Sequence, residues 1–121
     1  MFVDDDEDIL LSVRELLEEQ GDRYEYIGVN SGKKCLNLLK NGVKPDLILL
    51  DIMMPMLSGW EVYDRIRENS EWKYIPIVFL TARRDETAKS AGRFLGDGYI
   101  EKPLDGHTLL SVIQTILHKQ K

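Results

Sequence analysis

The chain has 121 residues, a length that fits one compact domain with a single hydrophobic core. Hydrophobic residues make up 43% of the chain and charged residues 31%, proportions that exclude a disordered or a fibrous protein. The formal net charge of -5 disfavours direct binding to nucleic acid, which needs a surplus of positive charge, so we expect protein partners. We therefore predict a single globular domain over residues 1–121.

The apolar runs of the chain are short. Residues 47–50 and 75–80 are typical of them, and both runs are far shorter than a segment that crosses a bilayer. The N-terminus also lacks the charged and then apolar pattern of a signal peptide. We expect a cytoplasmic protein that makes no membrane contact.

Short runs of β-forming residues alternate along the chain with amphipathic helical segments. In chain order, the predicted elements are strand 1–3, helix 8–20, strand 24–29, helix 32–41, strand 47–50, helix 59–69, strand 75–80, helix 86–95, a short strand centred on residues 99–100, and a final helix capped by Asp105. Alternation of this kind implies parallel crossovers, so we expect a mostly parallel sheet with helices on both faces.

The first helix has the clearest helical pattern. Its apolar residues recur at helical spacing and are Ile9, Leu10, Val13, Leu16 and Leu17. We expect Asp8 to cap the start of this helix and Gly21 to close its end. In the next helix the single cysteine, Cys35, occupies an apolar position, so we predict a small buried residue without chemistry.

Residues 47–50 are the most distinctive strand. They form a continuous apolar run without alternation, as expected for a central parallel strand that helices cover on both faces. The run places Asp51 at its carboxyl end. Because ligands of open parallel sheets bind beyond the carboxyl ends of the strands, residues in such positions are the candidates for function.

Chemically active residues occupy four of these strand ends. The acidic run 4–6 follows the first strand, Asp51 the third, Thr81 the fourth and Lys102 the fifth. Several carboxylates in one crevice repel one another unless a cation lies among them, and hard oxygen ligands suit Mg²⁺. The sequence therefore predicts a magnesium site at this edge of the sheet.

Lys102 and Thr81 complement the carboxylates. The Lys102 ammonium can pair with Asp51 at rest and with a phosphoryl oxygen afterwards, while the Thr81 hydroxyl can donate a hydrogen bond to another phosphoryl oxygen. This combination favours in-line attack of the Asp51 carboxylate on phosphorus. The product is an aspartyl phosphate, which water hydrolyses.

With these motifs the chain resembles the receiver domain of bacterial and archaeal two-component response regulators, including the chemotaxis regulators, over essentially its whole length. The matching segments are Val3-Asp4-Asp5, Asp51-Ile52-Met53-Met54-Pro55 with Gly59 following, Leu80-Thr81-Ala82, and Tyr99 through Lys102-Pro103. Each motif is weak alone, but all of them in this order are specific. The resemblance implies an α/β fold, the doubly wound (βα)5 flavodoxin-like three-layer sandwich with parallel strand order 2-1-3-4-5.

The resemblance also implies a role for each site residue. Asp51 is the expected phosphoacceptor, Lys102 and Thr81 contact the phosphoryl group, and Thr81 and Tyr99 form the switch. The expected Mg²⁺ ligands are Asp5, Asp51 and the backbone carbonyl of Met53, with Asp4 assisting directly or through water. The Lys102–Pro103 peptide bond is expected to be cis, with Pro103 as the cis-proline.

The implied function is a signalling module and not an enzyme acting on other substrates. A sensor histidine kinase or phosphotransfer protein would supply the phosphoryl group, and the output would be contact with a downstream effector protein or domain. The contact surface would comprise the fourth and fifth helices and the strand between them. We expect the self-dephosphorylation to be slow, because Met53 and Arg83 would shield the phosphoaspartate from water. The chain is either a stand-alone receiver or a part of a larger regulator or hybrid kinase.

Structural explanations compete for individual residues. The acidic run 4–6 can serve only the helix that follows it, Thr81 can be a turn cap, and Tyr99 can be a half-buried strand residue. Their joint occurrence with Lys102 and Pro103 favours the functional interpretation.

Two other function classes share features with this pattern. A small α/β phosphatase or phosphotransferase with an aspartyl-phosphate intermediate would need a second acid two residues after Asp51, where this chain has Met53. A flavin-binding electron carrier would need a hydroxyl-rich phosphate loop after the first strand, and the acidic run 4–6 stands there instead.

Overall fold

The structure, a computed structural model, describes residues 1–82 and 97–119. Its strands are β1 (Phe2–Val3), β2 (Gly28–Val29), β3 (Ile48–Asp51), β4 (Ile77–Thr81) and β5 (Gly98–Glu101). Its helices are α1 (Glu7–Glu18), α2 (Gly32–Lys40), α3 (Gly59–Glu68) and α5 (Gly106–Lys119), with a short 3-10 helix, η1 (Gly21–Arg23), after α1. The helix predicted at residues 86–95, and Arg83 before it, lie outside the described residues.

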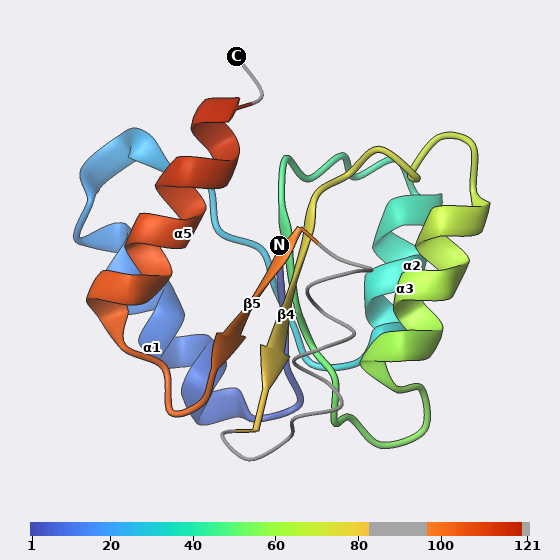
Figure 1. Cartoon of the computed structure of the whole chain (residues 1–121), viewed down its shortest axis with the longest axis horizontal. Helices are drawn as coiled ribbons and strands as arrows, with labels where there is room; N and C mark the ends of the chain where they lie inside the picture. Colours follow the sequence, from blue (N-terminus) through green and yellow to red (C-terminus); the bar gives the residue numbers. More distant parts are fainter. Residues whose placement is uncertain (83–96, 120–121) are drawn as a thin grey trace.

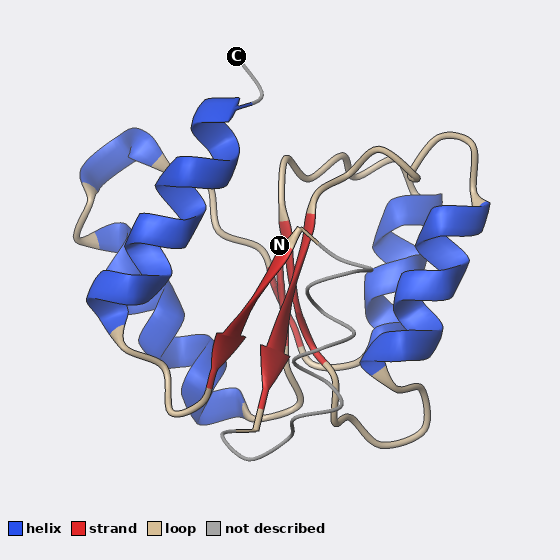
Figure 2. Cartoon of the chain, in the orientation of Figure 1, coloured by secondary structure: helices blue, strands red, loops and turns tan. Residues whose placement is uncertain are grey.

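The five strands form one parallel sheet in the order β2-β1-β3-β4-β5. Helices α1 and α5 cover one face of the sheet, and α2 and α3 cover the other, so the domain has three layers (Figures 1 and 2). The predicted doubly wound α/β fold and its strand order are confirmed. In the part of the chain that the structure describes, no helix is long and apolar enough to cross a membrane.

The central strand β3 is buried on both faces, as its continuous apolar run predicts. Ile48 and Leu50 pack into the core cluster under α2 and α3, whereas Leu49 packs into the cluster under α1 and α5. Cys35 of α2 is fully buried in the first of these clusters, as predicted. The sheet is therefore fixed from both sides, and this rigidity holds the carboxyl ends of its strands in place.

Strand β2 is shorter than the predicted strand at residues 24–29. Phe2 pairs with Gly28 and Val3 with Val29, and β1 offers no further residue for pairing. The Ile27 carbonyl still accepts a hydrogen bond of 2.8 Å from the Phe2 N–H. Residues 24–27 thus lack a neighbouring strand along most of their length, and a strand without a partner forms no ladder.

The N-terminal cap of helix α1 lies two residues before the predicted one. The Asp6 carboxylate, not that of Asp8, accepts hydrogen bonds from the Asp8 and Ile9 N–H groups at 2.9 and 3.4 Å. The prediction of Asp8 as cap is wrong because the capping side chain must precede the first helical turn, and Asp8 lies inside it. The Asp6 carboxylate therefore serves as the N-terminal cap of α1.

The start of α3 packs directly against the end of β3. The Gly59 N–H donates to the Ile52 carbonyl at 2.9 Å, and a Cβ atom at Gly59 would stand 2.4 Å from the Asp51 carbonyl oxygen. Ser58 caps the helix in a reciprocal arrangement with Glu61. Only glycine permits this approach, which fixes the loop that follows Asp51.

We expect Gly59→Ala to destabilise the domain by about 1–3 kcal/mol, the usual cost of forcing a methyl group into a packed position. The obstructing atoms are backbone atoms of residues 51 and 52, which cannot rotate away. Urea denaturation measures the change. Gly106→Ala is the matched control, because its Cβ would meet only the Leu16 side chain at 3.4 Å. A Gly59→Ala protein as stable as the control would contradict the close approach.

Candidate functional site

The carboxyl ends of the strands bring the predicted site residues to one edge of the sheet. Asp4 follows β1, Asp51 ends β3, Thr81 ends β4, and Lys102 follows β5. Thr81 pairs with Glu101 in the ladder, and the Lys102 N–H donates to the Thr81 carbonyl at 2.8 Å. Residues that are far apart in the sequence are thus held together by the parallel pairing of their strands.

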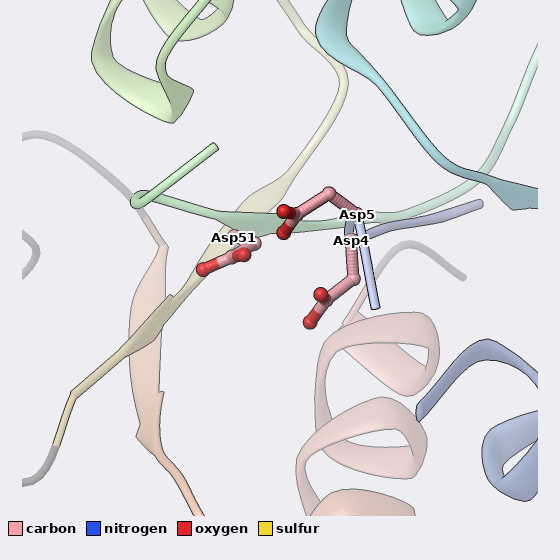
Figure 3. Close-up of side chains that lie close together, drawn as sticks. All are labelled: Asp4, Asp5 and Asp51. Atoms are coloured by element: carbon pink, nitrogen blue, oxygen red, sulfur yellow. The ribbon is translucent and has the colours of Figure 1, made fainter. Parts of the chain in front are cut away.

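Three carboxylates form the centre of this edge (Figure 3). Asp4, Asp5 and Asp51 each offer an oxygen atom, and these atoms all lie within 4.8 Å of one another. Asp4 and Asp51 are buried, with 0% and 4% of their surface exposed, whereas Asp5 is exposed. A set of hard oxygen donors, open to solvent on one side, fits a cation such as Mg²⁺ that keeps part of its water shell.

Lys102 supplies the positive charge of this site. Its Nζ lies 2.7 Å from Asp4 Oδ2 and 3.4 Å from Asp51 Oδ2. Burial alone would lower the pKa of Lys102, but the two carboxylates outweigh burial and raise it. The side chain is therefore a permanent cation at neutral pH. The Lys102–Pro103 peptide bond is cis.

The nearer partner of Lys102 is thus Asp4, although the sequence pointed to Asp51. The Asp4 carboxylate is also anchored at its other oxygen, since Oδ1 accepts a hydrogen bond of 2.9 Å from the Asp6 N–H. A fully buried carboxylate held in this way is positioned to keep the Lys102 ammonium beside Asp51. No feature of the sequence ranks the two acids, because the ranking depends on side-chain positions.

Asp51 has a perturbed acidity. Its burial and, next, the neighbouring Asp4 carboxylate raise the pKa of Asp51 to about 6, and Lys102 and the Met53 N–H oppose this rise without cancelling it. Negative charge is therefore costly in the pocket when no metal ion is bound. A bound divalent cation would favour the ionised carboxylate.

Thr81 contributes a buried hydroxyl group at the end of β4. Its side chain is 1% exposed, and Oγ1 has no hydrogen-bond partner among the residues that the structure describes. Buried polar atoms are nearly always paired, so an unpaired hydroxyl beside a charged pocket indicates a donor kept for a ligand.

The remaining predicted residues lie around the pocket. The Met53 N–H donates to Asp51 Oδ1 at 3.3 Å, and 70% of the Met53 surface is exposed. Tyr99 lies in β5 opposite Phe79 and packs against the core cluster under α2 and α3. The structure thus brings Met53 to Asp51 but places Tyr99 within the strand, before the strand end. Their functional roles stay predictions.

Comparison with models of protein families finds a match over most of the chain. The model of the response regulator receiver domain matches residues 1–114. The transcriptional regulatory protein CpxR of Escherichia coli (strain K12) is 34% identical over 120 residues, which are 98% of this chain and 49% of CpxR. The chain spans about half the length of the curated relatives it matches.

Solved structures show the same fold. The structure of a putative response regulator from Chloroflexus aurantiacus J-10-fl aligns with a TM-score of 0.87 and 30% identity, covering 97% of this chain and 94% of that one. The signal receiver domain of a signal transduction histidine kinase from Syntrophus aciditrophicus aligns with a TM-score of 0.86 and 26% identity, covering 99% and 89%. Similar domains thus occur in regulators and in kinases.

Proposed function

Because this chain belongs to the family of response regulator receiver domains, we propose that Asp51 accepts a phosphoryl group from a partner histidine kinase or phosphotransfer protein. The observation that carries this proposal is the surroundings of Asp51. Its carboxylate is 4% exposed, lies 3.4 Å from Lys102 Nζ and shares a 4.8 Å cluster with Asp4 and Asp5. Labelling by a small phosphodonor such as acetyl phosphate tests the assignment, because it needs no partner kinase.

The proposed reaction is a single in-line transfer. An Asp51 carboxylate oxygen forms a bond to phosphorus while the bond from phosphorus to the donor's imidazole nitrogen breaks, and the electron pair leaves with the imidazole. Lys102 keeps its positive charge beside the oxygens that gain negative charge. The Thr81 hydroxyl, unpaired among the described residues, donates a hydrogen bond to a phosphoryl oxygen.

The carboxylate cluster is the proposed Mg²⁺ site. Asp5 and Asp51 would hold the ion together with the Met53 backbone carbonyl, and Asp4 would act directly or through water. When bound, Mg²⁺ supplies positive charge that offsets the repulsion between the acidic pocket and an anionic donor. Asp6 is not part of this set, because its carboxylate caps α1.

We expect Asp5→Ala to weaken Mg²⁺ binding at least about tenfold, since it removes one charged ligand from the cluster. Asp6→Ala is the matched control. It removes a neighbouring carboxylate that lies outside the cluster, so it should weaken Mg²⁺ binding only slightly. It should also cost about 1 kcal/mol of stability, because the helix cap is lost. Isothermal titration calorimetry with Mg²⁺ decides the order. If Asp6→Ala impaired binding more than Asp5→Ala, the acidic pair would have to be shifted by one residue.

Phosphorylation would act as a switch for protein contacts. Thr81 and Tyr99 lie in the neighbouring strands β4 and β5, so movement of the Thr81 side chain toward a phosphoryl group can be transmitted to the next strand. The output surface would comprise β5, α5 and the predicted helix at 86–95, and its partner would be an effector protein or domain in the cytoplasm. The chain itself would contact neither nucleic acid nor membrane. It would catalyse only its own phosphorylation and slow dephosphorylation.

A further inference from the structure

The four methionines of the chain differ widely in exposure. Met53 and Met56, in the loop between β3 and α3, are 70% and 100% exposed. Met54, between them, is 8% exposed, and Met1 is partly buried with its sulfur 3.6 Å from the buried Cys35 sulfur. Two thioethers are therefore open to solvent, while the other sulfur atoms are shielded.

Met53 adjoins Asp51, the proposed phosphoacceptor. Its N–H donates to Asp51 Oδ1 at 3.3 Å, so its backbone touches the carboxylate while its side chain reaches solvent. The loop is held in this position, because the Gly59 and Met54 N–H groups both donate to the Ile52 carbonyl, at 2.9 and 3.2 Å. The exposed thioether thus belongs to a residue whose backbone contacts Asp51, in a loop segment that hydrogen bonds hold in place. Met56 is fully exposed, and among the described residues no hydrogen bond joins it to Asp51.

We propose that Met53 is an oxidation site, at which hydrogen peroxide or another two-electron oxygen donor forms a sulfoxide that draws water to Asp51. In this step the sulfur lone pair attacks one peroxide oxygen, so that an S–O bond forms and the O–O bond breaks. The hydroxide that leaves takes up the proton of the transferred oxygen and becomes water. Sulfur is oxidised by two electrons, and peroxide is reduced by two.

Oxidation changes how strongly the Met53 side chain can accept a hydrogen bond from water. A thioether is a weak hydrogen-bond acceptor, whereas a sulfoxide carries a strongly polar oxygen that binds and orients water. This consequence rests on the proposed function, since hydrolysis of an aspartyl phosphate needs a water molecule close to phosphorus. The Met53 sulfoxide should therefore shorten the lifetime of the phosphorylated state and couple it to peroxide.

The first measurement locates the modification. The purified chain is treated with a limited dose of hydrogen peroxide, and peptide mass spectrometry follows the oxidation of each methionine with time. Met53 and Met56 should be oxidised first, and Met54 and Met1 much later. Equal rates at all four residues, or Met54 ahead of Met53, would overturn the assignment.

The second measurement tests the consequence. The treated and untreated proteins are phosphorylated with acetyl phosphate, the donor is removed, and the decay of the phosphoprotein is followed by intact-mass spectrometry. Oxidation should speed the decay about three- to tenfold, the range that one added water-binding contact supports. A methionine sulfoxide reductase with a thiol reductant should restore the original rate.

Two variants separate Met53 from its exposed neighbour. In Met56→Leu, oxidation should speed decay as in the parent, whereas in Met53→Leu the treated and untreated samples should decay at the same rate. Each variant is compared with its own untreated sample. Acceleration that persists in Met53→Leu, or its absence in the parent, would overturn the inference. An untreated parent that takes up no phosphoryl group would refute the proposed function and the effect on lifetime, while the oxidation order would still decide the modification site.

Discussion

Replacing Asp51 with Asn is expected to reduce phosphorylation by acetyl phosphate and Mg²⁺ to the background of an untreated sample. The substitution keeps the size of the side chain but removes the anionic oxygen that attacks phosphorus, and an amide is a poor nucleophile. Intact-mass spectrometry counts the phosphoryl groups on each chain, and fragmentation locates them. The parent should carry one group, and chelation of Mg²⁺ should abolish the labelling.

A matched control keeps this result specific. Asp64 is an exposed acid of α3, outside the carboxylate cluster, so Asp64→Asn should be labelled as fully as the parent. Labelling of Asp51→Asn at the parent's level would refute the assignment of the phosphoacceptor. Continuous release of phosphate, much faster than the phosphoprotein decays, would instead favour the phosphatase alternative. That class needs a second acid two residues after Asp51, where the structure has the thioether of Met53.

The fold could be predicted from the sequence because its main signals are local. The apolar run at residues 47–50 has no alternation, and a strand of this kind is stable only between two layers of helices. Once five such strands alternate with helices, the parallel crossovers leave few topologies. The convergence of Asp51, Thr81 and Lys102 then follows, since the carboxyl ends of parallel strands meet at one edge of the sheet.

The details that were not predicted depend on distant or competing partners. The length of β2 is set by β1, which offers only Phe2 and Val3 for pairing, and nothing within residues 24–29 indicates this limit. Both Asp6 and Asp8 have capping side chains, and only the backbone conformation at Asp6 decides between them. Likewise, the closer approach of Lys102 to Asp4 than to Asp51 depends on how buried side chains are arranged in three dimensions.

Lys102→Met is expected to destabilise the domain by about 3 kcal/mol at pH 8 without Mg²⁺, at the low end of the cost of leaving a buried ion pair broken. Methionine keeps the length and apolar stem of lysine but removes the charge that lies 2.7 Å from Asp4 and 3.4 Å from Asp51. The exposed Asp5 side of the cluster admits water, which limits the loss. Chemical denaturation measures it, with the exposed Lys33→Met as the control.

The pH dependence of this loss identifies its cause. The pKa of Asp51 is about 6 in the parent, above the usual 3.8 of an aspartate, because of burial and the neighbouring Asp4, and removing the Lys102 cation should raise it further. An acid whose pKa is raised by folding binds protons more tightly in the folded state, so the stability of the variant should fall as pH rises from about 4 to above 6. The difference between variant and parent should accordingly be small at pH 4 and large at pH 8. A difference that did not vary with pH would indicate lost packing and not uncompensated charge.

Two rescues should follow from the same electrostatic cause. Adding Asp51→Asn to Lys102→Met removes one of the uncompensated carboxylates and should recover a large part of the lost stability at pH 8. Mg²⁺ should also stabilise Lys102→Met more than the parent, because in the variant the ion is the main positive charge available to Asp4, Asp5 and Asp51. Mg²⁺ titrations followed by thermal unfolding compare the two proteins. If Mg²⁺ stabilised the parent more than the variant, Lys102 would be assisting the binding of the cation, and the two positive charges would not be alternatives for one acidic pocket.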